Sequence, residues 1–376
     1  MPSRLLSYLT LPAFVLLIAG CGGGGGSAAP AGDSSAPAAE PARVYNWRMV
    51  TTWPENLPGM GVAPEKLSDM VTKMSAGRLN IKVYGAGRIV PAFGVFEAVS
   101  QGTVEMGHGA AYYWKGKVPA AQFFTAVPFG LTAQEMNGWL HHGGGMELWR
   151  ELYAKYNLVP IAGGNTGVQM AGWFNREVNS LDDLKGLKMR IPGLGGEVFD
   201  KAGGTAVNLP GGEIFTSLQT GVIDATEWVG PYNDLVFGLH QVAKYYYYPG
   251  WQEPGPTLEV IVNKEQYDSL PPDLQEILTA AARTINEDLL AEYTARNNAA
   301  LQELTGEHGV ELRRLPDDVL AALHEISLEV TAEIAETDPL ARRIHDSFLA
   351  YKRGVMSYQE ISERAYINAR ATSAPR

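Results

Sequence analysis

The sequence predicts an α/β protein of two domains, followed by a long helix and a helical tail. Short apolar segments typical of strands alternate with amphipathic segments typical of helices over residues 43–163, and the alternation recurs over 164–256. This alternation indicates β-α-β units and a mostly parallel sheet in each domain. Beyond residue 257 a single strand-like segment is followed almost entirely by helical patterns.

The N-terminal residues have the pattern of a lipoprotein signal peptide. Arg4 supplies a positive charge, the apolar run 9–19 is too short to cross a bilayer comfortably, and small residues precede Cys21. We expect residues 1–21 to be the signal peptide, with Cys21 lipidated; an ordinary secretory signal with a chance cysteine has the same outline. The glycine, serine, alanine and proline content of 22–42 indicates a flexible linker. The expected location is therefore extracytoplasmic, with a lipid anchor as the only membrane attachment.

The first predicted domain comprises residues 43–163. Its strands are expected at 45–51, 79–84 and 104–109, with helices at 64–76 and 93–101. The apolar segment 257–263 is typical of a strand that returns to this domain, so we expect residues 257–315 to complete it.

The second predicted domain comprises residues 164–256. Its chain enters through a strand at 158–162, and further strands are expected at 169–174, 187–191 and 245–248, with helices near 196–202 and 211–221. The glycine pair Gly163 and Gly164 lies between the two sets of elements, where it could act as a hinge.

The C-terminal third is predicted to be helical. A helix over 271–306 has no glycine or proline after its first residues until Gly306, and at 1.5 Å per residue it would be roughly 50 Å long. That length exceeds what either domain needs. Further helices are expected at 317–336, 340–351 and 358–370. The amphipathic last helix suggests that 317–376 packs on a partner subunit.

Arg190 is the first candidate for a binding residue. It ends the predicted strand 187–191, just before Pro192 and Gly193 and the helix that follows. Ligands in open α/β sheets gather at the carboxyl ends of strands, and an arginine there can bind a carboxylate through two parallel hydrogen bonds. A surface arginine without a binding role fits the same spacing.

Composition excludes some classes of function. The formal net charge is −11, from 30 basic and 41 acidic residues, so no broad basic surface favours nucleic acid as a partner. The glycines at 193–196 lack the lysine of a phosphate-binding loop, and His141 and His142 lack further ligands at zinc spacing, so a helix end is the better interpretation there.

Four segments together resemble the solute-binding proteins of tripartite ATP-independent periplasmic (TRAP) transporters, in particular those that bind 2-oxo acids and lactate. The resemblance extends from about residue 44 almost to the end of the chain, and these segments carry it: Gly164–Phe174, Leu187–Gly193, Asp224–Asp234 and Tyr248–Gly255. It implies a periplasmic-binding-protein-like fold in which two α/β domains close over a ligand and the long helix 271–306 spans both domains. It also implies a homodimer with exchanged C-terminal helices, and membrane permease subunits as partners.

The resemblance also implies roles for individual residues. Arg190 would bind the ligand carboxylate, with Gln169 beside it as a ligand to a bound cation. Glu227 and Trp228 would supply further cation ligands, partly through backbone oxygen, and Glu253 would supply another carboxylate. Gln169 and Trp228 would also contact the bound acid. Oxygen ligands suit Na⁺ or Ca²⁺, and the sequence does not choose between them.

The implied ligand is a small 2-oxo or 2-hydroxy monocarboxylate, such as pyruvate, 2-oxobutyrate or lactate. Its carboxylate and adjacent oxygen could chelate one cation, which would make two glutamates tolerable beside an anion. At least one aromatic side chain of residues 112–114 should point into the cleft between the domains, and Tyr112 is expected to donate a hydrogen bond to the ligand from its hydroxyl. Trp53, Phe93 and Trp251 are candidates for pocket walls or for core.

Three alternatives remain open at this stage. The ligand could be a dicarboxylate or a larger organic acid, and the protein could serve a sensor in place of a transporter. A metal-dependent, lipid-anchored enzyme with Glu227 or Glu253 as general base is a third, but no nucleophile paired with histidine stands out. We therefore expect a binding protein and no enzyme.

Overall fold

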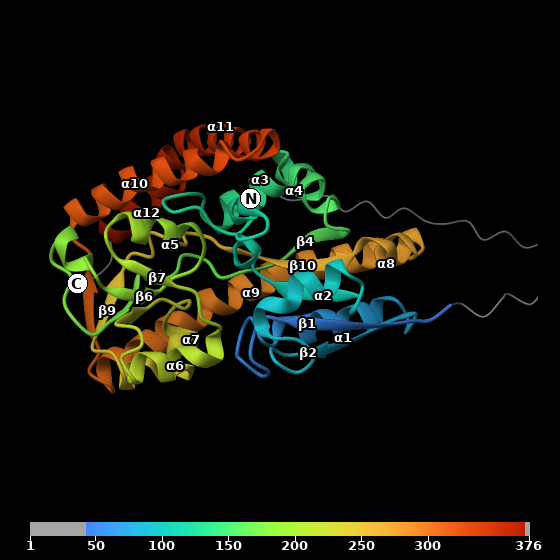
Figure 1. Ribbon diagram of the computed structural model, residues 1–376, viewed down its shortest axis with the longest axis horizontal. Coiled ribbons are helices and arrows are strands. Elements are labelled where there is room, and N and C mark those ends of the chain that lie inside the picture. The colour runs from blue at the N-terminus through green and yellow to red at the C-terminus, as the bar shows by residue number, and fades with distance from the viewer. Residues whose placement is uncertain (1–42, 373–376) are drawn as a thin grey trace, which may run out of the picture. The chain divides into compact units, whose positions relative to one another are not determined.

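The computed structural model describes residues 43–372 (Figure 1). The predicted signal peptide, the linker and the lipidation site Cys21 lie outside these residues. Two β-sheets with flanking helices make up the described chain, which confirms the α/β class. Within 43–372 no helix has the length and apolarity needed to cross a membrane.

The first sheet has the order β2-β1-β3-β10-β4. Its strands are β1 (Tyr45–Thr51), β2 (Leu79–Tyr84), β3 (Met106–Gly109), β4 (Leu158–Asn165) and β10 (Thr257–Asn263). The strands β1, β2 and β3 are parallel, as predicted, but β10 is antiparallel to β3 and β4. The difference arises because the chain leaves this sheet along β4 and returns along β10 in the opposite direction.

The second sheet has the order β11-β9-β5-β8-β6-β7. Its strands are β5 (Gly172–Phe174), β6 (Lys188–Arg190), β7 (Thr205–Val207), β8 (Ala225–Thr226), β9 (Tyr245–Tyr248) and β11 (Glu311–Arg314). The antiparallel strand of this sheet is β5, which pairs with β8 and β9. Although β11 belongs to the range 257–315 that was expected to complete the first domain, it pairs with β9 of the second sheet.

Helices surround both sheets. Those in the segments between strands are α1 (Ala63–Met74), α2 (Val95–Ser100), α3 (Ala133–His142), α4 (Gly145–Ala154), α5 (Gly193–Lys201), α6 (Gly211–Gln219), α7 (Pro231–Val236) and α8 (Lys264–Asp268), with short 3₁₀ turns including Ala111–Trp114 and Pro119–Phe124. The sequence-based prediction did not include α3 and α4. A capping box formed by Thr132 and Glu135 starts α3, and this pattern is visible in the sequence.

The long helix is confirmed as α9 (Pro272–Gly306), with 35 residues. It packs against α1 and β4 near the first sheet and against α7 near the second, so it contacts elements of both (Figure 1). Proline at its first position suits a helix start, because the missing N–H would have no helical partner there.

Three helices form the C-terminal part: α10 (Asp317–Ala335), α11 (Pro339–Ile361) and α12 (Glu363–Thr372). Of these, α10 packs on α5, whereas α11 packs on α3 and α4. The predicted interruption between residues 351 and 358 was wrong, because α11 continues through Gly354. One glycine inside a helix costs about 1 kcal/mol, which the packing of α11 outweighs.

The glycine pair predicted as a hinge lies inside β4, in ordinary strand conformation. A Cβ on Gly163 would stand 2.6 Å from Val260, and one on Gly164 would stand 2.9 Å from Leu289 of α9. The absence of side chains here therefore permits close packing of β4 against β10 and α9.

Candidate functional site

Arg190 is the centre of a buried polar site at the end of β6. Its side chain is 1% exposed, which excludes the alternative of a surface arginine. Because β6 pairs with β8 so that Arg190 lies opposite Thr226, the next residue, Glu227, comes beside the guanidinium. Nη1 of Arg190 donates to the backbone oxygen of Glu227 at 3.0 Å and also to its carboxylate.

The remaining contacts fix the plane of the guanidinium. Nε of Arg190 donates to the backbone oxygen of Leu209 at 3.1 Å, and Nη2 donates to the hydroxyl of Tyr113 at 3.2 Å. The Trp228 ring lies 5.1 Å from the guanidinium carbon, in cation–π geometry. The second N–H of Nη2 has no partner among these contacts, so it is available to an incoming acceptor.

Gln169 and Glu253 lie on two of the segments that connect the sheets, the one between β4 and β5 and the one between β9 and β10. The Gln169 backbone N–H donates to the Glu253 backbone oxygen at 3.1 Å, and Thr166 makes a similar bond to Pro256 at 3.3 Å. The segments approach so closely that a Cβ on Gly250 would lie 2.1 Å from the backbone oxygen of Gln169. The connections between the sheets therefore carry two of the predicted cation ligands.

Three side-chain oxygens of the predicted cation ligands are buried without a hydrogen-bond partner. They are Oε1 of Gln169, Oε2 of Glu227 and Oε2 of Glu253. Leaving such atoms unpaired is costly, so their presence together indicates an unmet demand for positive charge or for donors. This donor set fits a hard cation such as Na⁺ or Ca²⁺.

The pKa shifts of Glu227 and Glu253 also indicate a need for positive charge. Burial raises the pKa of Glu227 to about 7, although the positive charge of Arg190 opposes the shift. Burial raises the pKa of Glu253 well above its ordinary value, and repulsion from Glu227 adds to the increase. One arginine is thus too little positive charge for two buried carboxylates, and a cation would restore the balance.

Among residues 43–372 no three His, Cys, Asp or Glu side chains form a group that could hold a metal. The predicted cation ligands include only two carboxylates, so amide and main-chain oxygens would have to complete the coordination. Those ligands suit Na⁺ and Ca²⁺ and are poor ligands for zinc or copper.

Two tyrosines of the 3₁₀ turn after β3 face the site. Tyr113, one of the three residues 112–114 expected to reach the cleft, contacts Arg190 directly, whereas the sequence had favoured its neighbour Tyr112 as the hydroxyl donor. Burial raises the pKa of Tyr112 well above its ordinary value, and the negative charge of Glu253 adds to the increase, so Tyr112 lies beside that carboxylate. Both hydroxyls therefore stay protonated and can donate.

Aromatic side chains from both sheets form the apolar wall. Trp53 packs edge-on against Trp228 at 6.2 Å between ring centroids and against Tyr113 at 6.1 Å. Phe93 packs against Tyr113 at 4.8 Å, whereas Trp251 stacks on Phe129 at 5.8 Å. Trp53 and Phe93 therefore reach the site through Tyr113, and Trp251 packs with the aromatic core.

A cleft of about 790 Å³ adjoins this wall. Two segments face each other across it, one from each half of the chain: 86–93 and 208–213, with Thr52 and Pro54 beside the first. Leu209, which lines this cleft, also accepts a hydrogen bond from Arg190 through its backbone oxygen.

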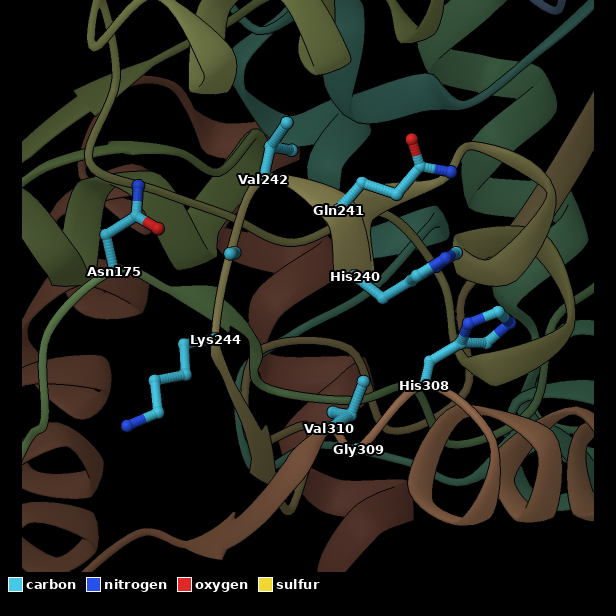
Figure 2. Close-up of a pocket in the computed structure, with 9 residues that line it drawn as sticks. Asn175, His240, Gln241, Val242, Lys244, His308, Gly309 and Val310 are labelled. Carbon is cyan, nitrogen blue, oxygen red and sulfur yellow. The ribbon is translucent and has the colours of Figure 1, made fainter.

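A separate cavity of about 370 Å³ lies between the turn before β9 and the loop after α9, with Asn175 at its edge (Figure 2). No predicted site residue lines it. Figure 2 shows His240 and His308 side by side, with ring centroids 4.1 Å apart. The other histidine pair, His141 and His142, ends α3 as expected.

Comparison with known proteins gives a consistent picture. Residues 49–338 match the family model described as bacterial extracellular solute-binding protein, family 7. A monocarboxylate 2-oxoacid-binding periplasmic protein of Nostoc sp. is 42% identical over 327 residues, 87% of this chain and 89% of the relative.

Two solved structures are similar along nearly their whole length. One is a TRAP periplasmic solute-binding protein from Pseudoalteromonas atlantica with bound sodium and pyruvate, at 45% identity and a TM-score of 0.84, covering 87% of this chain and 99% of the other. The second, a TRAP solute-binding protein from Bordetella bronchiseptica, is 36% identical with a TM-score of 0.86 and covers 88% and 98% of the two chains. It is a dimer of mixed occupancy, with copurified calcium and picolinate in one site. With its α/β fold, its long helix and most of its length matched, this chain belongs to family 7 of the bacterial extracellular solute-binding proteins.

Proposed function

We propose that this protein is the solute-binding subunit of a TRAP transporter and binds a small 2-oxo or 2-hydroxy monocarboxylate together with one cation. The observation that carries the proposal is the buried pair of Arg190 and Glu227, with three buried side-chain oxygens around it that have no partner. It is supported by the Pseudoalteromonas protein with pyruvate and sodium, and by the Bordetella protein with picolinate and calcium. Both of those ligands present a carboxylate next to a second donor atom, which is the arrangement that chelates a cation.

In this proposal, different residues bind the carboxylate and the cation. Arg190 binds the carboxylate through Nη2, while Gln169, Glu227 and Glu253 hold the cation together with the backbone oxygen of Trp228. The cation neutralises the second glutamate, so an anionic ligand is no longer repelled. Tyr112, beside Glu253, donates a hydrogen bond from its hydroxyl to the ligand.

The delivery of the ligand follows from the same proposal. Two domains, 43–163 and 164–256, close over the acid and present the loaded form to the membrane permease subunits. Lipidation of Cys21 would hold the protein at the membrane on its extracytoplasmic side, and the linker 22–42 would give it reach. The exposed apolar residues of α11 and α12 support a homodimer built through the C-terminal tail.

The test is calorimetric titration of a chain that starts at Arg43, using pyruvate, 2-oxobutyrate, lactate and succinate. Each titration is repeated after removal of divalent ions and after exchange of Na⁺ for K⁺. We expect tight binding of a monocarboxylate that disappears without one of the two cations, because the acid completes the coordination. Binding of succinate alone would replace the proposed ligand class with dicarboxylates.

Substitution of Arg190 tests the carboxylate contact. Arg190→Ala should lower pyruvate affinity by at least a few kcal/mol, since it removes a charge-assisted contact and leaves Glu227 without its partner. Arg190→Lys keeps the charge but loses the planar arrangement of donors, so it should recover only part of the affinity. Full affinity in the alanine variant, with the fold verified by circular dichroism, would contradict the proposal.

A further inference from the structure

His108 lies on β3, fully buried, between the site wall and the strand that leaves the first sheet. Its Nδ1 is 2.7 Å from Nε1 of Trp53, and its Nε2 is 3.0 Å from the backbone oxygen of Gly163. The ring therefore connects Trp53 to β4 shortly before that strand ends at Asn165.

The two contacts define which nitrogen carries the proton. An indole N–H can only donate, so Nδ1 of His108 accepts from Trp53, and Nε2 must carry the hydrogen that is donated to Gly163. Burial lowers the pKa of His108 to about 4, so the ring stays neutral at physiological pH and keeps this arrangement. His108 is thus a fixed acceptor on one side and a fixed donor on the other.

Trp53 is the residue that carries the effect of His108 to the site. It is 1% exposed and contacts both Trp228 and Tyr113 through its ring. Those two residues are the ones that lie against the Arg190 guanidinium and its Nη2. The contact between Trp53 and Trp228 also joins a residue of the first half of the chain to one of the second.

We propose that His108 is a positioning residue for ligand binding: it fixes the orientation of the Trp53 indole, which supports Trp228 and Tyr113 around Arg190. The inference rests on the proposed function, because it assigns His108 a part in the affinity for the acid. His108 itself touches neither Arg190 nor the two glutamates in any described contact. Its effect is transmitted through Trp53 alone.

Two substitutions separate the two hydrogen bonds of His108. In His108→Asn the side-chain amide oxygen lies near the position of Nδ1 and can still accept from Trp53. In His108→Gln the amide nitrogen lies near the position of Nε2 and can still donate to Gly163, but Trp53 loses its acceptor. Each variant gives up one buried hydrogen bond, so their losses of thermal stability should be similar.

Pyruvate affinity distinguishes a positioning role from a structural one. We expect His108→Asn to bind nearly as the wild type does, and His108→Gln to bind about tenfold more weakly, which corresponds to the loss of one buried hydrogen bond. Tyr153→Phe is the control: it removes an equally buried hydrogen bond, to Glu259 of the same sheet, and Tyr153 packs in a different apolar cluster from the one that contains Trp53. It should lower stability and leave affinity unchanged.

A double-mutant cycle with Trp53→Phe tests the route of the effect. Phenylalanine has no N–H to donate, so the difference between His108→Asn and His108→Gln should vanish in that background. In protein labelled with 5-fluorotryptophan, the ¹⁹F resonance of Trp53, assigned by its loss in Trp53→Phe, should move in His108→Gln and stay in place in His108→Asn without any ligand.

Equal affinities of the two His108 variants, or a difference between them that persists in the Trp53→Phe background, would overturn the inference. Binding of pyruvate by the wild type would leave the proposed function intact in that case. An unmoved ¹⁹F resonance in His108→Gln would overturn the inference as well. Failure of the wild type to bind any of the four acids would instead overturn the proposed function and this inference with it.

Discussion

At the scale of single residues, the site contains more negative than positive charge. Glu227 and Glu253 are both buried, and only Arg190 offers a full positive charge to them among the described contacts. The unpartnered oxygens and the raised pKa values express the same deficit. Proton uptake and cation binding are therefore two competing ways to neutralise the same carboxylates.

This competition predicts a pH dependence of cation affinity. Since the pKa of Glu227 is raised to about 7 and that of Glu253 also lies above its ordinary value, the empty site binds protons below neutral pH. Cation binding must release them, so affinity should fall as the pH decreases below about 7, by up to about tenfold per unit for each proton released. Calorimetry in two buffers of different ionisation enthalpy measures the protons released.

Glu253→Gln provides the control for this prediction. It removes one titrating carboxylate, so it should bind the cation more weakly at about pH 8 and show a shallower pH dependence. A wild-type affinity that stays constant from about pH 8 down to about pH 5.5 would contradict the assignment of Glu227 and Glu253 as cation ligands.

At the scale of elements, the end of α11 and the whole of α12 lack a complete partner within the described part of the chain. The large apolar side chains Met356, Tyr358, Ile361, Tyr366 and Ile367 are between 47% and 75% exposed, and α12 has no buried residue. A groove of about 440 Å³ lies between these helices and the segment around Phe129. Such a surface is typical of an interface between subunits.

Truncation tests this interface. A chain that ends at Met356 should be monomeric, whereas the chain from Arg43 to Arg376 should be a dimer, because the missing residues carry most of the exposed apolar area of the tail. Sedimentation equilibrium measures the difference. Glu325→Gln, on an exposed part of α10, should leave the dimer unchanged. A dimer that survives truncation would exclude the tail as the main interface.

Local sequence patterns were sufficient to locate several helices and strands, but not to predict how the strands pair. Turn residues and apolar periodicity located β1, β2, β9, β10 and α9 almost to the residue, since each carries its own signal. The antiparallel direction of β10 and the place of β11 in the second sheet depend on where the chain returns in space. No short segment contains that information.

The same limit applies to the site. The strand-end position of Arg190 is visible in a few residues of sequence. Its bond to Glu227, by contrast, depends on the register of β6 against β8, and its bond to Tyr113 joins residues from different halves of the chain. His108 and Trp53 belong to no motif and are brought together by the pairing of β1 with β3. Sequence could therefore nominate Arg190 without identifying what holds it in place.

At the scale of the whole molecule, side chains from the two halves meet at the edge of the site. Lys115, just after the turn that carries Tyr112 and Tyr113, donates to Glu197 of α5 at 3.1 Å and to the backbone oxygen of Gly193 at 3.3 Å. Glu197 also accepts from Gln122 at 3.2 Å. These contacts join the two halves and would be lost if the domain movement proposed for ligand binding separated them.

Removal of the ion pair between Lys115 and Glu197 should speed ligand release. Lys115→Met is expected to raise the dissociation rate of pyruvate by up to about fivefold, the upper range for a partly exposed ion pair, and to change the association rate little. Stopped-flow measurement gives both rates. Lys117→Met is the matched control, because Lys117 pairs with Glu97 of the same half of the chain. Equal effects of the two substitutions would refute a role of Lys115 in closure.

The contacts of Arg190 also reduce the entropy cost of binding a ligand. A free arginine side chain samples many rotamers, and immobilising it on binding costs about 0.5–1.5 kcal/mol. Here Leu209, Tyr113 and Glu227 hold the guanidinium before any acid arrives. That ordering cost is met when the chain folds, so a ligand of only a few atoms, with little contact area to offer, can retain nearly all the free energy of its carboxylate contact.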